Sequence, residues 1–354
     1  MPNINIAQTE IGEGCSPFIV AELSGNHQQD YSLAEKMLEA AAVAGVHAIK
    51  LQTYTSETMT LDLQNKDFVI NDEASLWQGE SLYSLYAKAA TPWEWHQGLF
   101  EKARSLGMIA FSSPFDESAV DFLETLNVPC YKIASFENND LPLIKKVAQT
   151  GKPIIVSTGM ASVIEIEELL MTIRATGNEQ IVLLKCTSNY PADASDSNLA
   201  TIADMRQRFQ CLIGLSDHCS GISVSLAGVA LGAVLVEKHF VLDRTAGGID
   251  AAFSLEPDEL EKLVHDSVII NRAMGQVQYG GSENEQESKK YRRSIYCSRA
   301  IAVGEIISRD NVRVIRPGFG LAPKHFDAIM GKTAKQAIAL GDAMRFDLLD
   351  GSDE

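Results

Sequence analysis

The sequence has none of the features that mark a secreted or membrane-spanning chain. Its first residues, Met1-Pro2-Asn3-Ile4-Asn5, include no basic segment followed by an apolar run, so we expect no signal peptide. No later stretch approaches the roughly 20 consecutive apolar residues that a transmembrane helix requires. These absences predict a soluble, cytoplasmic protein that has no membrane partner.

Basic residues are also scarce. The chain of 354 residues contains 30 Lys and Arg against 47 Asp and Glu, which gives a formal net charge of −17. Binding of nucleic acid needs a concentrated basic face, so this balance argues against nucleic acid as a partner. An anionic substrate therefore needs a local positive site, for which lysines at strand ends are the first candidates.

No two cysteines have the Cys-x-x-Cys spacing that is typical of metal and redox motifs. Several of the cysteines lie inside apolar runs, and we expect buried thiols in a reducing cytoplasm. The six are Cys15, Cys130, Cys186, Cys211, Cys219 and Cys297.

Eight short apolar or β-branched runs end in polar residues and alternate with helical patterns, which is typical of βα units around a parallel sheet. The runs are FIVAEL (18–23), AIKLQTY (48–54), MIAFSSP (108–114), CYKIAS (130–135), PIIVSTG (153–159), IVLLKCT (181–187), CLIGLSDH (211–218) and AVLVEKHF (233–240). Eight units in about 220 residues favour a closed barrel over an open doubly wound sheet. No Gly-x-Gly-x-x-Gly opens the first helix. We therefore predict an α/β fold, a (β/α)8 TIM barrel.

Helix ends are recognisable between these runs. Ser32 leads the first helical pattern, Thr91-Pro92-Trp93-Glu94 predicts a capping box with proline at the first helical position, and Ser162 to Glu165 predicts a second box. Residues 55–90 form a long insertion after the second strand. We expect this insertion to cross the barrel mouth.

The two ends of the chain differ in character from the barrel repeats. Residues 1–17 alternate weakly and contain Gly12-Glu13-Gly14, which predicts a small hairpin that plugs the barrel bottom. We place the barrel domain at 1–280, a polar linker at 281–290 and a separate β-rich domain at 291–354.

The carboxyl ends of the strands hold the active site in a barrel of this type. Alternation of side chains along each strand points one set of polar residues toward a common mouth. This set is Glu22, Lys50, Gln52, Lys132, Ser216, His218, Glu237 and His239. Strand ends are often polar only because they meet solvent. Convergence of several charged groups at one mouth favours a functional site instead.

Two histidines end adjacent strands, His218 on the seventh and His239 on the eighth. Such a pair can bind one divalent metal and leave positions open for water and substrate oxygens. In this interpretation Asp217 and Glu237 orient the imidazoles. A histidine satisfied within the core or at the surface is the structural alternative for each.

Lysines and hydroxyls of the kind that hold a phosphate occur at the same strand ends: Lys50, Lys132, Ser113, Ser135 and Ser216. A Schiff-base role is the competing interpretation for Lys132, and the neighbouring serines favour phosphate. Glu22 and Glu137 are carboxylates near the mouth, suited to acid or base catalysis. For Glu137, beside two asparagines, simple solvation is the alternative.

These motifs together resemble the sialic acid synthase family, whose members condense phosphoenolpyruvate with an amino sugar. The matching segments are residues 21–27 (AELSGNH), 50–54 (KLQTY), 111–115 (FSSPF), 131–135 (YKIAS), 185–191 (KCTSNYP), 215–218 (LSDH), 237–240 (EKHF) and 316–318 (RPG). They span nearly the whole chain in the family's order.

The resemblance implies a TIM barrel followed by an antifreeze-protein-like SAF domain, in a domain-swapped homodimer where Arg316 reaches the partner's substrate. It implies His218 and His239 as ligands of manganese or magnesium, with cobalt as an alternative. Residues implied to hold phosphoenolpyruvate are Lys50, Ser113, Lys132, Ser135, Asn189 and Ser216. Residues implied to contact sugar or water are Glu22, Glu137, Gln52, Tyr190 and Asp250.

Two segments, residues 23–27 (LSGNH) and 85–96, are similar to the pseudaminic acid synthase branch of this family. The acceptor implied is 2,4-diacetamido-2,4,6-trideoxy-L-altrose, with the N-acetylneuraminate or legionaminic acid precursor as alternatives. Such a 6-deoxy sugar needs an apolar pocket wall, for which Leu23 and Tyr54 are candidates. A lysine-dependent barrel aldolase and a non-catalytic sugar-binding module are the rival interpretations.

Overall fold

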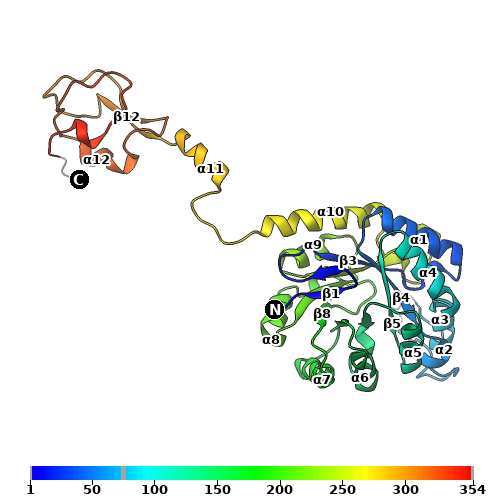
Figure 1. Ribbon diagram of the computed structural model, residues 1–354. Coiled ribbons are helices and arrows are strands. Elements are labelled where there is room, and N and C mark those ends of the chain that lie inside the picture. The colour runs from blue at the N-terminus through cyan, green and yellow to red at the C-terminus, as the bar shows by residue number, and fades with distance from the viewer. Residues whose placement is uncertain (1, 73–76, 352–354) are drawn as a thin grey trace. The chain divides into compact units, whose positions relative to one another are not determined.

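The computed structural model describes residues 2–72 and 77–351 and divides the chain into two compact units, Met1–Gly275 and Gln276–Glu354 (Figure 1). Each unit has its own hydrophobic core. The first holds the predicted barrel, and the second holds the predicted small domain.

The first unit is a closed barrel of eight parallel strands, in which each strand pairs with the next and the last pairs with the first. The strands are β3 (Phe18–Glu22), β4 (Ala48–Thr53), β5 (Ile109–Pro114), β6 (Tyr131–Ile133), β7 (Ile154–Ser157), β8 (Ile181–Cys186), β9 (Leu212–Asp217) and β10 (Leu235–His239). Each lies within one of the eight predicted runs. The predicted TIM barrel is confirmed.

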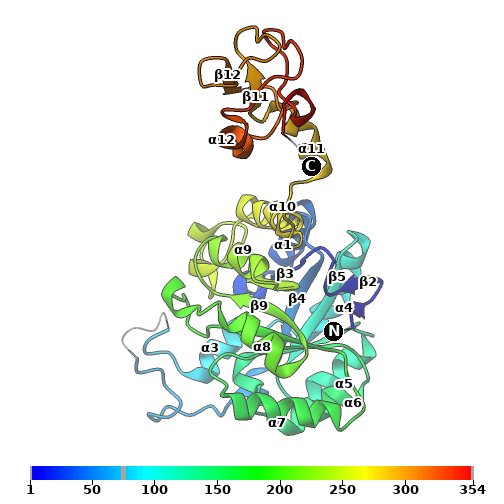
Figure 2. The same cartoon turned by 90° about the vertical axis from the view of Figure 1, so that its left-hand side faces the viewer.

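The strands are buried on both faces, which explains why their sequences are almost continuously apolar. Ile19 and Ala21 face the helices, whereas Phe18 and Val20 face the barrel interior. In Figure 2, α6 and α7 lie outside the central strands. The main helices of this unit are α1 (Tyr31–Val43), α4 (Trp93–Ser105), α5 (Glu117–Thr125), α6 (Leu141–Gln149), α7 (Val163–Arg174), α8 (Thr201–Phe209), α9 (Ser223–Ala230) and α10 (Pro257–Met274).

A hairpin of β1 (Ile4–Ile6) and β2 (Thr9–Ile11) closes the amino-terminal end of the barrel. Ile6 and Ile11 are fully buried and belong to the same apolar cluster as Phe18, at the start of β3. The predicted plug is confirmed.

Two of the three predicted helix starts need correction. Asp30, not Ser32, caps α1, because its carboxylate accepts hydrogen bonds from the amides of Ser32 and Leu33. Among the residues that the structure describes, no side chain caps α4, since the Thr91 hydroxyl bonds to His27 Nε2 at 3.1 Å instead. The capping box between Ser162 and Glu165 is confirmed at α7.

The insertion after β4 contains two short helices, α2 (Ser56–Met59) and α3 (Leu82–Ala89). Side chains of this insertion line a cavity together with Glu137 and His239, which lie at the carboxyl ends of barrel strands. The insertion therefore covers the mouth, as predicted.

In the described part of the second unit, β11 (Ser294–Cys297) pairs antiparallel with β12 (Val312–Ile315), and short helices form at α11 (Glu283–Ser288) and α12 (Phe326–Ile329). Isolated β-bridges such as Ile301 with Ile338 extend its sheet structure. Helix α11 lies within the segment predicted as a linker.

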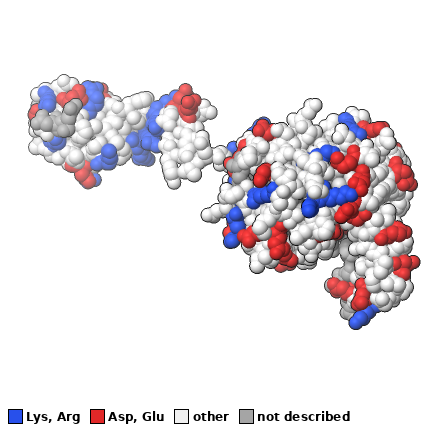
Figure 3. Space-filling model, turned by 60° about the horizontal axis from the view of Figure 1, so that its bottom comes forward, with Lys and Arg blue, Asp and Glu red and all other residues white. Residues whose placement is uncertain are grey.

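The cysteines and the surface charges agree with what the composition predicted. Each of the six cysteines is a free thiol. Lysines and arginines are interspersed with acidic side chains on the face of the barrel that Figure 3 shows. Of the described helices, none combines the length and apolar character needed to cross a bilayer.

A buried ion pair lies behind the mouth, between β9, β10 and α9. Lys238 Nζ is 3.0 Å from Asp217 Oδ2 and also donates to the Cys219 carbonyl oxygen. Asp217 further accepts from the Ser225 hydroxyl at 2.6 Å. The prediction that Asp217 orients a metal ligand is therefore wrong, because its side chain points out of the barrel.

Replacement of Lys238 by Met should lower the free energy of unfolding by about 3–5 kcal/mol, since it leaves a buried carboxylate without its cation. Urea denaturation measures this loss. Lys262→Met is the matched control: Lys262 pairs with Asp266 on α10 but is 65% exposed, so its removal should cost less than about 1 kcal/mol. A loss no larger than the control's would contradict the account.

Candidate active site

Four charged side chains from four strands meet inside the carboxyl end of the barrel. They are Glu22 of β3, Lys50 of β4, Lys132 of β6 and Glu237 of β10, each 4% exposed or less. Lys50 Nζ lies 2.5 Å from Glu22 Oε2 and 3.8 Å from Glu237 Oε2. Lys132 Nζ lies 3.3 Å from Glu237 Oε1. Glu237 thus joins the two lysines, and we call these four residues the charged cluster.

Burial divides the charged cluster into fixed and titratable members. Burial opposes charge on Lys50 and on Glu237, yet the opposite charges around them outweigh it, raising the pKa of Lys50 and lowering that of Glu237. For the other two members burial wins: it raises the pKa of Glu22 despite Lys50, and it lowers the pKa of Lys132 despite Glu237. Glu22 and Lys132 are therefore the members suited to exchanging a proton.

Hydroxyl and amide groups surround the charged cluster. Lys50 Nζ is 3.4 Å from Ser113 Oγ, Ser216 Oγ donates to Glu237 at 3.1 Å, and Gln52 donates to Glu22 at 2.9 Å. Ser135 Oγ lies nearby and accepts from the Gly159 amide at 3.2 Å.

One hydroxyl in this set was not predicted. Ser157, at the end of β7, accepts a 2.8 Å hydrogen bond from Lys132 Nζ. Alternation from Ile155, which faces the barrel interior, would have placed Ser157 inward as well.

The partners of Glu237 also correct a prediction. This carboxylate was predicted to orient a histidine, but it contacts Lys50, Lys132 and Ser216. The group that orients His218 is instead the Thr187 carbonyl oxygen, which accepts from Nδ1 at 2.9 Å. In the neutral ring this bond fixes the proton on Nδ1 and leaves the lone pair on Nε2.

The two histidine rings lie beside each other, with centroids 5.2 Å apart. His239 Nδ1 is buried and has no hydrogen-bonding partner among the described residues, and Asp250 Oδ2 is 3.7 Å away. Burial lowers the pKa of His239 well below its ordinary value, so the ring is neutral. An orphaned nitrogen on one ring and a free Nε2 on the other fit a divalent metal. Within the described parts of the chain, no group of three or more His, Cys, Asp or Glu side chains could hold a metal ion.

A cavity of about 300 Å³ opens above the charged cluster. Its barrel side carries Ser24, Gln52, Glu137 and Asp250. Burial raises the pKa of Glu137 to about 7 and that of Asp250 to about 7. The Ser24 hydroxyl donates to the Asp250 carboxylate, which ties the loop after β10 to the turn after β3.

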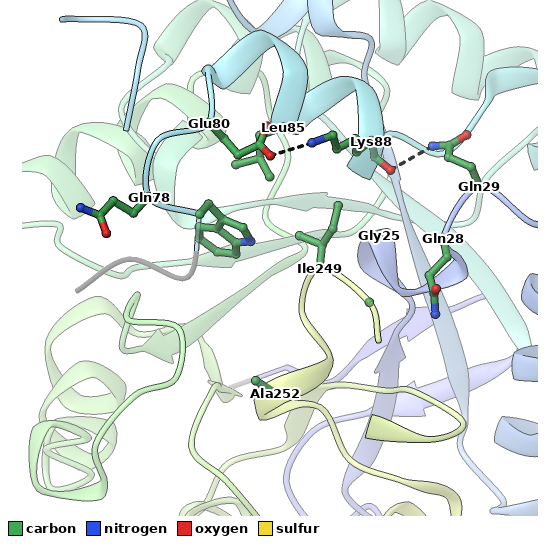
Figure 4. Close-up of a pocket in the computed structure, with 11 residues that line it drawn as sticks. Gly25, Gln28, Gln29, Gln78, Glu80, Leu85, Lys88, Ile249 and Ala252 are labelled. Atoms are coloured by element: carbon green, nitrogen blue, oxygen red, sulfur yellow. Dashed lines mark hydrogen bonds and ion pairs between the residues drawn. The ribbon is translucent and has the colours of Figure 1, made fainter. Parts of the chain in front are cut away.

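A second cavity, of about 640 Å³, lies beside the first and shares Trp77, Leu85 and Ile249 with it (Figure 4). Gln28, Gln29 and the ion pair between Lys88 and Glu80 give it a polar lining. The mouth therefore continues outward into a wider, more polar space.

The remaining predicted site residues differ in position. The Tyr190 ring lies 4.5 Å from the His218 ring, at the edge of the first cavity. Asn189 is exposed. Arg316 is exposed and follows β12 in the second unit.

Of the two predicted wall residues, Tyr54 lines the first cavity. Leu23 does not, because it is fully buried against the surrounding helices.

Comparison with known proteins places this geometry in a family. Residues 37–279 match the NeuB family and residues 292–350 match the SAF domain. Pseudaminic acid synthases of Campylobacter jejuni and Helicobacter pylori are 41% and 40% identical, over 93% and 95% of this chain and 95% and 98% of theirs. The structure of N-acetylneuraminic acid synthetase from Leptospira borgpetersenii matches with a TM-score of 0.73 at 33% identity, covering 81% of this chain and 95% of that one. The chain belongs to the NeuB family and carries a SAF domain, as its motifs predicted.

Proposed function

We propose that the chain condenses phosphoenolpyruvate with 2,4-diacetamido-2,4,6-trideoxy-L-altrose and releases phosphate, the reaction of a pseudaminic acid synthase. The charged cluster beside two imidazoles at the barrel mouth is the observation that carries this proposal. His239 is the strand partner of Glu22, so imidazoles and cluster share one mouth. The pseudaminic acid synthases at about 40% identity support the choice of acceptor.

The charged cluster suits phosphoenolpyruvate because its positive charge is adjustable. With all four members ionised, two lysines balance two glutamates. When Glu22 takes up a proton, which its raised pKa favours, the cluster carries one net positive charge. Lys50 and Lys132 then face the phosphate and carboxylate, with hydrogen bonds from Ser113, Ser135, Ser216 and Asn189.

We assign His218 and His239 as ligands of a divalent metal, manganese or magnesium, with cobalt as an alternative. Bound there, the metal supplies Lewis-acid polarisation of the acceptor's aldehyde. Gln52, Tyr190 and Asp250 hold the open-chain sugar so that its C1 lies beside C3 of the enolpyruvate. This orientation removes much of the entropic cost of a two-substrate reaction.

Bond changes in the proposed reaction balance as follows. C3 of phosphoenolpyruvate bonds to C1 of the sugar, and the former aldehyde oxygen gains a proton. Water adds at C2 and loses one proton. The C2–O bond to phosphate then breaks with its electron pair on the phosphate oxygen, and the proton of the C2 hydroxyl passes to the phosphate, which leaves a keto acid. Glu22 and Glu137 hold these protons, and Lys50 and Lys132 offset the charge of the tetrahedral intermediate.

We also propose that the SAF domain acts in a domain-swapped homodimer, in which Arg316 contacts the substrate held by the partner. The exposed position of this arginine within the second unit is consistent with such a role.

The proposal is tested by phosphate release with three acceptors: N-acetylmannosamine and the two diacetamido-trideoxy sugars that lead to pseudaminic and legionaminic acids. We expect release to require phosphoenolpyruvate and a divalent metal, with the highest kcat/KM for the L-altrose sugar. A lysine-dependent aldolase needs neither phosphoenolpyruvate nor a divalent metal, and a binding module releases no phosphate. Release without added metal, or none with any acceptor, would contradict the proposal.

Variants of the two histidines extend this assay. His218→Ala and His239→Ala should each abolish metal-dependent turnover, because one imidazole does not hold the ion. His265→Ala, on the surface of α10 with a side chain 70% exposed, is the matched control and should keep full activity. Full activity of either site variant in the presence of a chelator would refute the metal assignment.

Glu137→Gln should lower kcat at least about 100-fold, since it removes an acid/base group. It should also change stability with pH. The pKa of Glu137 is about 7 in the folded state against 4.5 ordinarily, so ionisation opposes folding increasingly from pH 4.5 to 7. At pH 8 the variant should therefore be more stable than the parent, by up to about 3 kcal/mol, with no gain at pH 4. Thermal unfolding at both values measures the difference, and an equal gain at pH 4 would contradict it.

A further inference from the structure

The cavity above the charged cluster has two unlike walls. On the barrel side it presents carboxylate, amide and imidazole groups from Gln52, Glu137, His239 and Asp250. The insertion after β4 contributes the hydrocarbon and thioether groups of Met59, Ile70, Leu82 and Leu85, which we call the apolar roof. The rings of Trp77 and Tyr86, from the same insertion, line the cavity beside them.

We infer that the apolar roof determines acceptor specificity by receiving the methyl end of a 6-deoxy sugar. This inference rests on the proposed function, because it assigns a role to residues around that same site. It adds the residues that distinguish a 6-deoxy acceptor from a 6-hydroxy one.

The orientation of the acceptor follows from where its carbon atoms react. The new bond forms at C1, so C1 must lie on the barrel side, where His239 and the charged cluster are found. C6 is at the opposite end of the open chain. A volume of about 300 Å³ is at the small end for ligand sites, so one extended sugar fills the cavity and its C6 meets the roof.

The chemistry of the roof then decides between a methyl and a hydroxyl at C6. Ile70 and Leu82 are partly exposed to the cavity and offer no hydrogen-bond donor or acceptor in their side chains. A methyl group packed against these two side chains gains apolar contact, whereas a hydroxyl there gives up water and finds no hydrogen-bonding partner in them. An apolar pocket rejects an added hydroxyl by up to about 100-fold.

The test compares two acceptors that differ by one oxygen atom, 2,4-diacetamido-2,4,6-trideoxy-L-altrose and the same sugar with a hydroxyl at C6. The chain itself should favour the 6-deoxy sugar in kcat/KM by about 10- to 100-fold. Ile70→Thr and Leu82→Asn each place a polar group in the roof. Each should reduce that ratio by about tenfold, with a gain on the 6-hydroxy sugar as well as a loss on the 6-deoxy one.

Leu61→Asn is the matched control. Leu61 belongs to the same insertion but is 62% exposed and does not line the cavity, so the ratio should stay at the parent value. A variant that is only partly folded loses activity on both sugars equally, which leaves its ratio informative. If one of the two roof variants fails to fold, the other still measures the acceptor ratio.

Outcomes of this test separate the two claims. If the parent chain releases phosphate with the 6-deoxy sugar but both roof variants keep its acceptor ratio, the roof inference is overturned and the proposed function stands. If the parent releases phosphate with neither sugar, the proposed function fails and the roof inference fails with it. A tenfold fall in ratio for the roof variants alone supports the inference.

Discussion

Two lysines and two glutamates are buried together inside the barrel mouth, and the remaining site depends on how they balance. None of the four is stable there alone, because an isolated charge in an apolar interior is costly. Glu237 contacts both lysines and Glu22 contacts Lys50, so each charge has an opposite neighbour. The barrel supplies this arrangement because adjacent strands bring their carboxyl ends to one rim.

This balance has a consequence for binding anions. Burial alone favours the neutral form of all four groups, yet only Glu22 and Lys132 shift that way. Lys50 and Glu237 keep their charges because each is flanked by opposite charge. A site of this kind changes its net charge with one proton on Glu22. With both lysines charged, that proton leaves one net positive charge at the mouth of an otherwise acidic chain.

Strand alternation made much of the site predictable from the sequence. It placed Lys50, Lys132 and Glu237 on inward positions. In the structure the amino groups of both lysines lie within 4 Å of the Glu237 carboxylate. The same rule, applied strictly, would have excluded Asp217 from the residues that face the mouth, because it lies between two inward residues. Its side chain pairs with Lys238 outside the barrel. Ser157 was also within reach of that rule.

Other features were beyond sequence reasoning. The start of α1 depends on whether Asp30 or Ser32 meets the free amides, and both residue types are good caps. The roof residues Ile70 and Leu82 lie in an insertion without strand or helix periodicity over most of its length, so no pattern pointed them at the cavity. Their role depends on tertiary folding of that segment over the mouth.

The central claim is that the lysines of the charged cluster stabilise a tetrahedral carbon from which phosphate leaves. The most direct measurement uses phosphoenolpyruvate labelled with ¹⁸O at the bridging oxygen between C2 and phosphorus. Attack of water on C2 breaks the carbon–oxygen bond, so the account predicts that the label appears in the released phosphate. Recovery of the label in the keto acid, with none in the released phosphate, would show that water attacks phosphorus and would contradict this claim.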